Sequence, residues 1–378
     1  MTHRSNVTMT DEEIYQKLRE YIHGLSFGYV TTDENLLEAG ADLIMLKEFI
    51  TPQEALYILD MPEDDFFTVE WFAEKQEMSL EEADETLRNM ALRANVYREK
   101  RADGNIWYHN VPAAHGIYEF HAGPDMNANW LGNGLFPVLQ TGTLQIVYDA
   151  GIPFYRCVPL GSEVVIEGEL LPEDDIFAKL KTHRRFSIAP CACLNATRDV
   201  LGVHNCDHPT GVCIQTDEMA DYYIDDLGLG REATLEETEK ILRDCIANDL
   251  AVQTTFAKKN EIICSCSVCH CGILPALANW PGDAAQYVTN YEVLFNRLAC
   301  TKCETCVTSC PMHCITLDSD GYPEITGQCI GCGQCVRNCE SDARVLTVKS
   351  FESMHPLPER IWDTYPIMEQ MRREKGAL

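Results

Sequence analysis

The amino-acid sequence predicts an α+β fold with more than one domain, on three observations. Helix-start signals followed by a hairpin pattern occupy the N-terminal part of the 378 residues. Short β-prone runs beside turn residues recur further along the chain. Grouped cysteines fill the second half. At roughly 100–200 residues per domain, a chain of this length holds two to four domains.

The composition is that of a globular protein with a strongly acidic surface. Apolar residues make up 46% and charged residues 24%, which excludes disorder as the dominant state. Thirty Lys and Arg stand against 59 Asp and Glu, so the formal net charge is −29. Such a field repels polyanions, so we do not expect nucleic acid as a partner, whereas a basic protein surface would be attracted.

Hydropathy and cysteine usage indicate where the protein works. No run of about 18 apolar residues is present, so no membrane-spanning helix is expected. The polar, acidic stretch 1–16 lacks the pattern of a signal peptide. We therefore expect a cytoplasmic protein, in which 19 cysteines indicate metal sites and not a disulfide framework.

Local signals in the N-terminal part predict helices followed by a hairpin. Acidic residues from Asp11 onward suit the first turn of a helix. Thr51 before Pro52 is a typical N-cap, and Ser79 opens a capping box. The turn pair Asp103-Gly104 lies between two β-prone runs and predicts a hairpin. Helices followed by a hairpin indicate a winged helix-turn-helix.

The middle of the chain carries weaker signals. Val164–Ile166 is predicted to be a strand, and Leu170–Asp175 a turn. Thr234 opens a second capping box, whose helix carries Leu242 and Cys245 on one apolar face.

The strongest motif lies in the C-terminal third. Two cysteine runs share the spacing C-x2-C-x2-C-x3-C. A tight loop can present three thiolates to three irons of a cubane, while the following helix carries the fourth cysteine toward another cluster. The spacing therefore predicts two [4Fe–4S] clusters. The eight cysteines are Cys300, Cys303, Cys306, Cys310, Cys329, Cys332, Cys335 and Cys339.

Residues 297–349 resemble the bacterial-type ferredoxin domain that holds two [4Fe–4S] clusters. The resemblance implies that cluster one is bound by Cys300, Cys303, Cys306 and Cys339, and cluster two by Cys329, Cys332, Cys335 and Cys310. Gly331 and Gly333 are expected to let the backbone approach the inorganic sulfides. Glu340 stands where the family usually has Pro, a departure that removes no ligand. Zinc is the alternative metal, but zinc modules favour separated cysteine pairs.

Eight cysteines further upstream form a second candidate metal group. Their C-x-C and C-x2-C elements suit up to two further [4Fe–4S] clusters, tetrahedral zinc or a dithiol redox site. The dicluster motif in the same chain favours clusters. Four ligands within Cys264–Cys271 surround a cubane poorly, so we expect shared ligation, with the helix after Thr234 bringing the two groups together. The eight are Cys191, Cys193, Cys206, Cys213, Cys264, Cys266, Cys269 and Cys271.

The remaining thiols and the nearby histidines receive weaker assignments. Cys157, Cys245 and Cys314 are expected to be buried structural thiols. Each histidine near the upstream cysteines is expected to be a surface or supporting group more than a ligand, because enough cysteines are present. These histidines are His204, His208 and His270.

The whole chain is similar to a family of uncharacterised multi-domain iron–sulfur proteins of anaerobic bacteria. The matching pieces are Ala189–Cys193, Ile263–Gly272 and Cys300–Cys339. Many members carry more cysteines in the second piece, where this chain has Ser265, Ser267, Val268 and His270. The resemblance implies anaerobic electron transfer without defining a reaction.

These observations divide the chain into five parts. We predict a helical segment over 1–40, a winged-helix-like domain over 41–115, a cysteine-rich middle domain over 116–296, a dicluster ferredoxin domain over 297–349 and a tail along the surface over 350–378.

The predicted function is single-electron transfer to or from a partner oxidoreductase. One alternative is an iron–sulfur reductase with its own active site in residues 116–290. The other is a redox-responsive DNA-binding protein, although Lys47–Asp103 holds seven Lys or Arg against fifteen Asp or Glu. No Walker A or G-x-G-x-x-G motif supports nucleotide binding. The sequence predicts neither the partner nor the oligomeric state.

Overall fold

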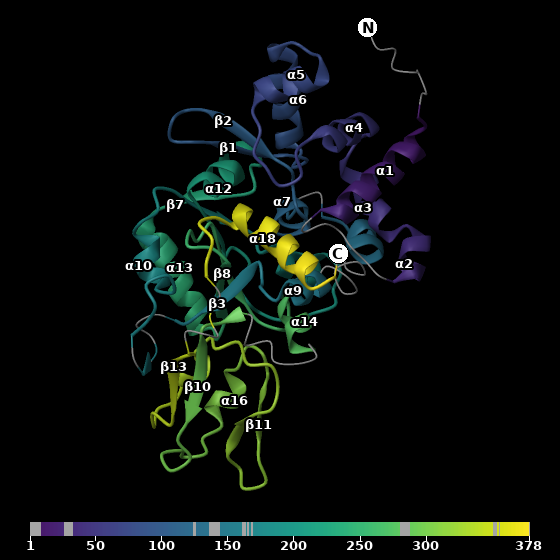
Figure 1. The fold of residues 1–378 in the computed structure, drawn as a ribbon. Coiled ribbons are helices and arrows are strands. Elements are labelled where there is room, and N and C mark those ends of the chain that lie inside the picture. Colours follow the sequence, from purple (N-terminus) through teal and green to yellow (C-terminus); the bar gives the residue numbers. More distant parts are fainter. Residues whose placement is uncertain are drawn as a thin grey trace. The chain divides into compact units, whose positions relative to one another are not determined.

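A computed structural model describes residues 9–25, 33–123, 126–135, 144–160, 164, 166–167, 169–279, 288–350, 354 and 356–377. The chain separates into two compact units, Met1–Gln145 and Ile146–Leu378. Each unit contains helices and a sheet, which confirms the predicted α+β class (Figure 1). The five-part division stays a prediction. Among the described residues, no helix is both long enough and apolar enough to cross a membrane.

The first unit is helical apart from one hairpin. Its elements are α1 (Asp11–Gly24), α2 (Glu34–Ala39), α3 (Ala41–Phe49), α4 (Pro52–Asp60), α5 (Val69–Gln76), α6 (Leu80–Leu92), β1 (Tyr97–Lys100), β2 (Ile106–His109), α7 (Tyr118–Phe120) and π-helical turns at Ala113–Ile117 and Trp130–Leu135. The predicted helix starts are confirmed, because Thr10, Thr51 and Ser79 each close a capping box. The hairpin is confirmed as well, with Gly104 in its turn at φ 87°.

The second unit holds all 19 cysteines and begins within α9 (Leu144–Ala150). Its other helices are α10 (Ile176–Leu180), α11 (Ala192–Leu194), α12 (Asp217–Asp221), α13 (Leu235–Ala247), α14 (Leu274–Ala278), α16 (Thr305–Thr308), α17 (Gln334–Arg337) and α18 (Ile361–Glu374), with π-helical turns at Asn195–Val200 and Tyr222–Asp226. None of the 19 cysteines forms a disulfide.

A six-stranded antiparallel sheet forms the centre of this unit, in the order β3-β8-β9-β6-β5-β7. Its strands are β3 (Tyr155–Val158), β5 (Phe186–Ala189), β6 (Cys213–Thr216), β7 (Arg231–Ala233), β8 (Ala251–Thr255) and β9 (Ile262–Cys266). Successive side chains of a strand point to opposite faces. Val252, Ile214 and Ile263 therefore share one face, where they pack with Leu242 and Ile246 of α13.

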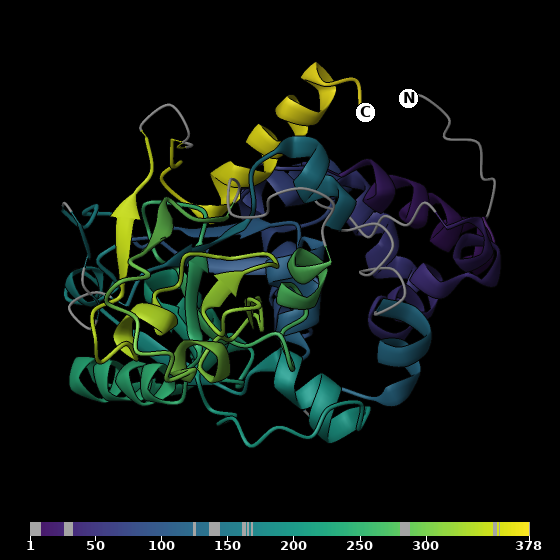
Figure 2. The same ribbon diagram turned by 90° about the horizontal axis from the view of Figure 1, so that it is seen from below.

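Helix α13 begins where the sequence predicts and lies along that face (Figure 1, Figure 2). The Thr234 hydroxyl accepts a hydrogen bond from the Glu237 backbone N–H at 3.2 Å. The cysteines of the strands lie on the opposite face. α13 therefore packs on the face away from the strand cysteines, while its Ile241 and Cys245 share a small core with Cys191. The expected role of this helix in bringing the cysteine groups together stays a prediction.

Short elements hold the C-terminal cysteine runs. β10 (Tyr291–Phe295) pairs antiparallel with β13 (Arg344–Val348), which pairs in parallel with β4 (Ile166–Glu167). β11 (Ile315–Leu317) pairs antiparallel with β12 (Pro323–Ile325). The strand predicted at 164–166 is confirmed only in its last residue, and residue 165 lies outside the described residues.

Within the predicted C-terminal tail, residues Ile361–Glu374 form the helix α18. α18 buries Ile361, Trp362, Tyr365 and Met368. The Thr364 hydroxyl donates to the Phe256 carbonyl at 2.9 Å, which fixes the helix to the segment after β8.

Candidate iron–sulfur and metal sites

The C-terminal cysteine runs fold as two copies of one unit, offset by 29 residues. α16 and α17 are equivalent helices at this offset. Positive φ angles recur at three equivalent pairs, Lys302 and Gly331, Glu304 and Gly333, and His313 and Asp342. Such backbone conformations are rare outside glycine, so their repetition marks the duplication that the cysteine spacing predicts.

The first hollow is lined by Cys300, Cys303, Cys306 and Cys339. The empty space in and at the mouth of this hollow, open solvent included, is about 300 Å³. Cys303 is exposed and Cys306 is buried, so one end of this site reaches the surface. The Thr305 hydroxyl donates to the Cys303 sulfur at 3.4 Å, and this hydrogen bond lowers the pKa of Cys303. The arrangement favours thiolate at the exposed end, as a metal ligand requires.

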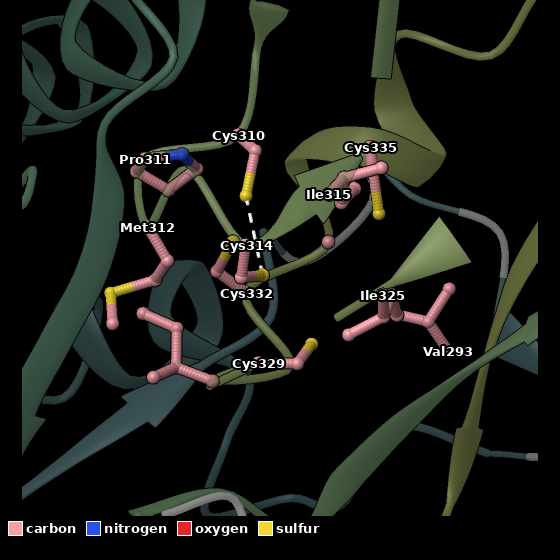
Figure 3. A pocket seen from close by; sticks show the side chains of 12 residues that line it. Val293, Cys310, Pro311, Met312, Cys314, Ile315, Ile325, Cys329, Cys332 and Cys335 are labelled. Carbon is pink, nitrogen blue, oxygen red and sulfur yellow. Dashed lines mark hydrogen bonds between the residues drawn. The ribbon is translucent and has the colours of Figure 1, made fainter. Parts of the chain in front are cut away.

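The second hollow is lined by Cys310, Cys329, Cys332 and Cys335, and its empty space, open solvent included, is about 320 Å³. A fifth cysteine, Cys314, also lines it. Figure 3 shows the sulfur of Cys310 directed at that of Cys314, 3.6 Å away. Hydrogen bonding with the Cys314 thiol lowers the pKa of Cys310 to about 6 and that of Cys329 to about 7. Cys314 is buried, as expected, but it belongs to the wall of this site.

The two hollows thus gather the cysteines in the sets that the ferredoxin resemblance implies, each set containing one cysteine from the other run. Their assignment as ligands stays a prediction.

The charge and burial of Arg344 indicate whether the first hollow suits an anionic cluster. The side chain lines the hollow, is 2% exposed, and donates from Nη2 to the Pro323 carbonyl at 3.0 Å. Its buried Nε and Nη1 have no hydrogen-bond partner among the described residues. Burial raises the pKa of neighbouring Cys306, and the Arg344 charge opposes that rise. A buried cation without a counter-charge is costly. The hollow therefore fits a cluster bound by thiolates, which would supply that counter-charge.

The structure gives a reason for glycine at position 331 besides the expected approach of the backbone to the sulfides. A Cβ at Gly331 would lie 2.7 Å from the Tyr291 carbonyl oxygen and 2.8 Å from the Thr289 hydroxyl oxygen. Its φ of 60° adds to the preference for glycine. The close approach to the sulfides stays a prediction.

The upstream cysteines divide into two groups, the larger of which has six members. Cys213 of β6 aligns with Cys264 of β9, because Ile214 pairs with Ile263 in the same register. Cys264 and Cys266 lie two residues apart and so share one face of the sheet. The six are Cys191, Cys193, Cys213, Cys264, Cys266 and Cys271, which we call the six-thiol group.

The thiols of the six-thiol group lie close together, and this crowding raises the pKa values of several of them. Hydrogen bonding with Cys213 and burial raise the pKa of Cys264 well above its usual value, and hydrogen bonding with Cys264 does the same for Cys266. The Gln215 amide donates to the Cys213 sulfur at 3.0 Å. A metal cluster would hold such thiols as thiolates, and amide donors of this kind stabilise sulfur ligands.

The smaller group combines two cysteines with two histidines. Cys206, His208, Cys269 and His270 each offer one ligand atom, and the four atoms lie within 4.8 Å of one another. His208 Nδ1 and His270 Nδ1 are 3.3 Å apart, and the Cys269 sulfur lies 3.3 Å from the first and 3.2 Å from the second. The Cys206 sulfur lies 3.8 Å from His270 Nδ1. We call these residues the Cys2His2 group.

Direct contacts connect the upstream groups to the second hollow. The Val268 backbone N–H donates to the Pro311 carbonyl at 2.8 Å, next to Cys310. Cys157 is buried in the same core as Cys271 and Cys332. Its burial agrees with the expected structural role, and the core that it shares contains cysteines of both the six-thiol group and the second hollow.

The sequence interpretation missed or underrated four residues. His208 and His270 were expected to support ligands, although the C-x-H spacing of Cys206 and His208 was a usable signal. Cys314 was assigned only to the core and Arg344 received no role. When the two runs are aligned at an offset of 29, Cys314 is equivalent to Ala343 and Arg344 is equivalent to Ile315. Both residues therefore stand out as differences between the two halves.

Comparison with known protein families matches residues 299–344 to the 4Fe-4S dicluster domain. No curated protein and no solved structure gives a significant match to the chain. The protein is therefore an iron–sulfur protein with a ferredoxin-type dicluster domain. The clusters of such domains are redox centres, so the match supports electron transfer. The wider family resemblance and the anaerobic origin stay predictions.

Proposed function

We propose that the protein is a cytoplasmic electron-transfer component that passes single electrons between a partner oxidoreductase and clusters of its own. The dicluster match at residues 299–344 carries this proposal. When bound, [4Fe–4S] clusters supply one-electron redox chemistry. Cys300, Cys303, Cys306 and Cys339 would hold the first, and Cys329, Cys332, Cys335 and Cys310 the second.

The six-thiol group is the proposed site of a third [4Fe–4S] cluster. Four of its six thiols would serve as ligands, and the amide of Gln215 supports Cys213. The contact between Val268 and Pro311 ties this group to the second hollow. Electrons would enter at exposed Cys303 and move inward through the buried second cluster to the third.

The partner is proposed to be a protein with a basic docking face. The net charge of −29 favours such a surface, and charge complementarity accelerates encounter. Glu304, exposed beside Cys303, lies where the partner would approach the first cluster.

A rapid-mixing experiment tests this function. The protein, reduced without oxygen, is mixed with an oxidised basic acceptor such as cytochrome c, and electrons delivered per chain are counted. We expect up to three electrons, with a rate that falls as salt rises. Glu304→Lys should slow the transfer several-fold, whereas Glu236→Lys, the same charge change on α13, should not. Turnover of a small substrate without any acceptor protein would favour the reductase alternative and contradict the proposal.

We propose that the winged-helix-like region docks protein and not DNA. Glu81, Glu82 and Glu85 are exposed on α6, which would be its recognition helix. Arg93 donates to the Phe49 carbonyl at 2.9 Å, and Arg101 pairs with Glu99 at 2.6 Å, so two of its cations already have partners. Saturable DNA binding at physiological salt in either redox state would overturn this assignment.

A further inference from the structure

We propose that the Cys2His2 group binds one zinc ion. The site is separate from the iron sites of the proposed function, and its four ligands are Cys206, His208, Cys269 and His270. Both sulfurs and both Nδ1 atoms already face one another within 4.8 Å.

Four of the six distances between the ligand atoms match the edges of one small tetrahedron, and the other two are at most 4.8 Å. Zinc bonds of about 2.0–2.1 Å to nitrogen and 2.3 Å to sulfur require ligand atoms about 3.3–3.8 Å apart in tetrahedral geometry. The four measured separations between ligand atoms run from 3.2 to 3.8 Å. Two sulfur and two nitrogen ligands in a tetrahedron are typical of zinc.

The same distances disfavour an iron–sulfur cluster with histidine ligands. In a two-iron cluster of that kind, the thiolates bind one iron and the imidazoles bind the other. Sulfur and nitrogen would then be separated by two metal ions. Here the Cys269 sulfur lies 3.2 Å from His270 Nδ1 and 3.3 Å from His208 Nδ1, so one ion fills the space between them.

The surrounding chain supports a structural role for the ion. Cys206 and His208 lie on a loop without helix or strand, and Cys269 and His270 follow β9. Arg198 donates from Nη1 to the carbonyls of Cys206 and His208, at 3.3 and 3.2 Å, which holds the loop in place. Four protein ligands leave no open position, as in structural zinc sites. The ion would fasten this loop to the turn that contacts Pro311.

The site also changes how many iron clusters the chain can hold. If zinc binds Cys206 and Cys269, only the six-thiol group remains of the eight upstream cysteines to bind iron. Two cubanes with thiolate ligands alone need eight cysteines. The upstream region therefore holds one such cluster at most.

Zinc analysis and zinc-edge X-ray absorption on the full chain, purified without oxygen from zinc-supplemented cells, test the proposal. We expect one zinc per chain, with two sulfur ligands near about 2.3 Å and two nitrogen ligands near about 2.0–2.1 Å. His208→Ala with His270→Ala should lower zinc at least tenfold and leave iron unchanged. His204→Ala, an exposed histidine of the same loop, should leave both unchanged.

Three results would overturn the proposal. The first is wild-type protein without zinc. The second is zinc with four sulfur ligands, which would move the ion into the six-thiol group. The third is loss of iron and not zinc from the double histidine variant, which would make the histidines ligands of an iron cluster. The absorption measurement needs no variant, so a variant that fails to fold does not affect it. Failure of the electron-transfer proposal would instead appear as missing iron with zinc retained.

Discussion

Arg344 and Ile315 occupy equivalent positions in the two halves of the dicluster domain, and they give the halves different electrostatics. Arg344 lines the first hollow, and Ile315 lines the second. Arg344 is buried, and no carboxylate among the described residues pairs with it. Cluster potentials depend on nearby charge and on hydrogen bonds to sulfur. A fixed cation at one site should therefore raise its potential above that of the other.

Replacing Arg344 with Met should lower the potential of one cluster. A unit charge about 8 Å away contributes ~2 kcal/mol at an effective dielectric constant of ~20. For a one-electron couple this corresponds to about 90 mV. A redox titration followed by electron paramagnetic resonance measures the shift. Arg344→Lys, which keeps the charge, and Arg297→Met, at a partly exposed site, should shift it far less. Unchanged potentials in Arg344→Met would contradict this role.

Cys314 is expected to tune the second cluster as a hydrogen-bond donor without ligating it. Its equivalent in the other half is Ala343, so Cys314→Ala places a residue that this fold already accommodates. We expect iron and sulfide contents equal to those of the wild type and a small fall in one potential, because a donor to ligand sulfur is lost. Loss of about four irons per chain would instead identify Cys314 as a ligand. Cys332→Ser provides the comparison in which a proposed ligand is changed.

Single residues with strong local signals were predictable from the sequence. Thr51 and Ser79 cap their helices as predicted because a cap depends on its own neighbours. Eight of the nine cysteines around the two hollows are those that the spacing singled out, and the ninth is Cys314. Arg344 was not predictable as part of a site, because its significance comes from burial beside Cys306 and not from any motif.

At the scale of elements, strand pairing assembles the six-thiol group. The pairing of β6 with β9 places Cys213 beside Cys264 across 51 positions of sequence. No local pattern encodes which strands become neighbours, and for this reason the alignment of Cys213 with Cys264 was not predictable from the sequence. The C-terminal tail shows the same limit, since the buried face of α18 depends on contacts with the segment after β8.

Gln334 connects the dicluster domain to the rest of the second unit. Its buried amide on α17 donates to the carbonyls of Ile246 and Leu250, at 2.9 and 2.8 Å. Gln334→Leu would remove this donor from both carbonyls. The Ile246 carbonyl keeps the hydrogen bond from the Asp249 backbone N–H at 3.1 Å, so the cost of about 1–3 kcal/mol for an unsatisfied group falls on Leu250. We expect faster amide hydrogen exchange at the C-terminal end of α13, measured by mass spectrometry. Gln370→Leu, at an exposed position of α18, is the matched control. Equal exchange in both variants would contradict the role of Gln334.

At the scale of the whole molecule, the sites form a sequence from surface to interior. Exposed Cys303 marks one end, the second hollow follows, and the six-thiol group lies beyond the contact of Val268 with Pro311. The Cys2His2 group lies next to that contact and would stabilise the turn without carrying electrons, because zinc has no redox chemistry. We expect three clusters, and neither two nor four, along this path.

The number of clusters is tested by measuring iron and acid-labile sulfide per chain on full-length protein reconstituted without oxygen. Three [4Fe–4S] clusters predict about twelve iron and twelve sulfide. About sixteen of each would mean that the upstream cysteines hold two clusters, Cys206 and Cys269 included. About eight of each would leave the six-thiol group without a cluster. Either value would contradict the three-cluster account.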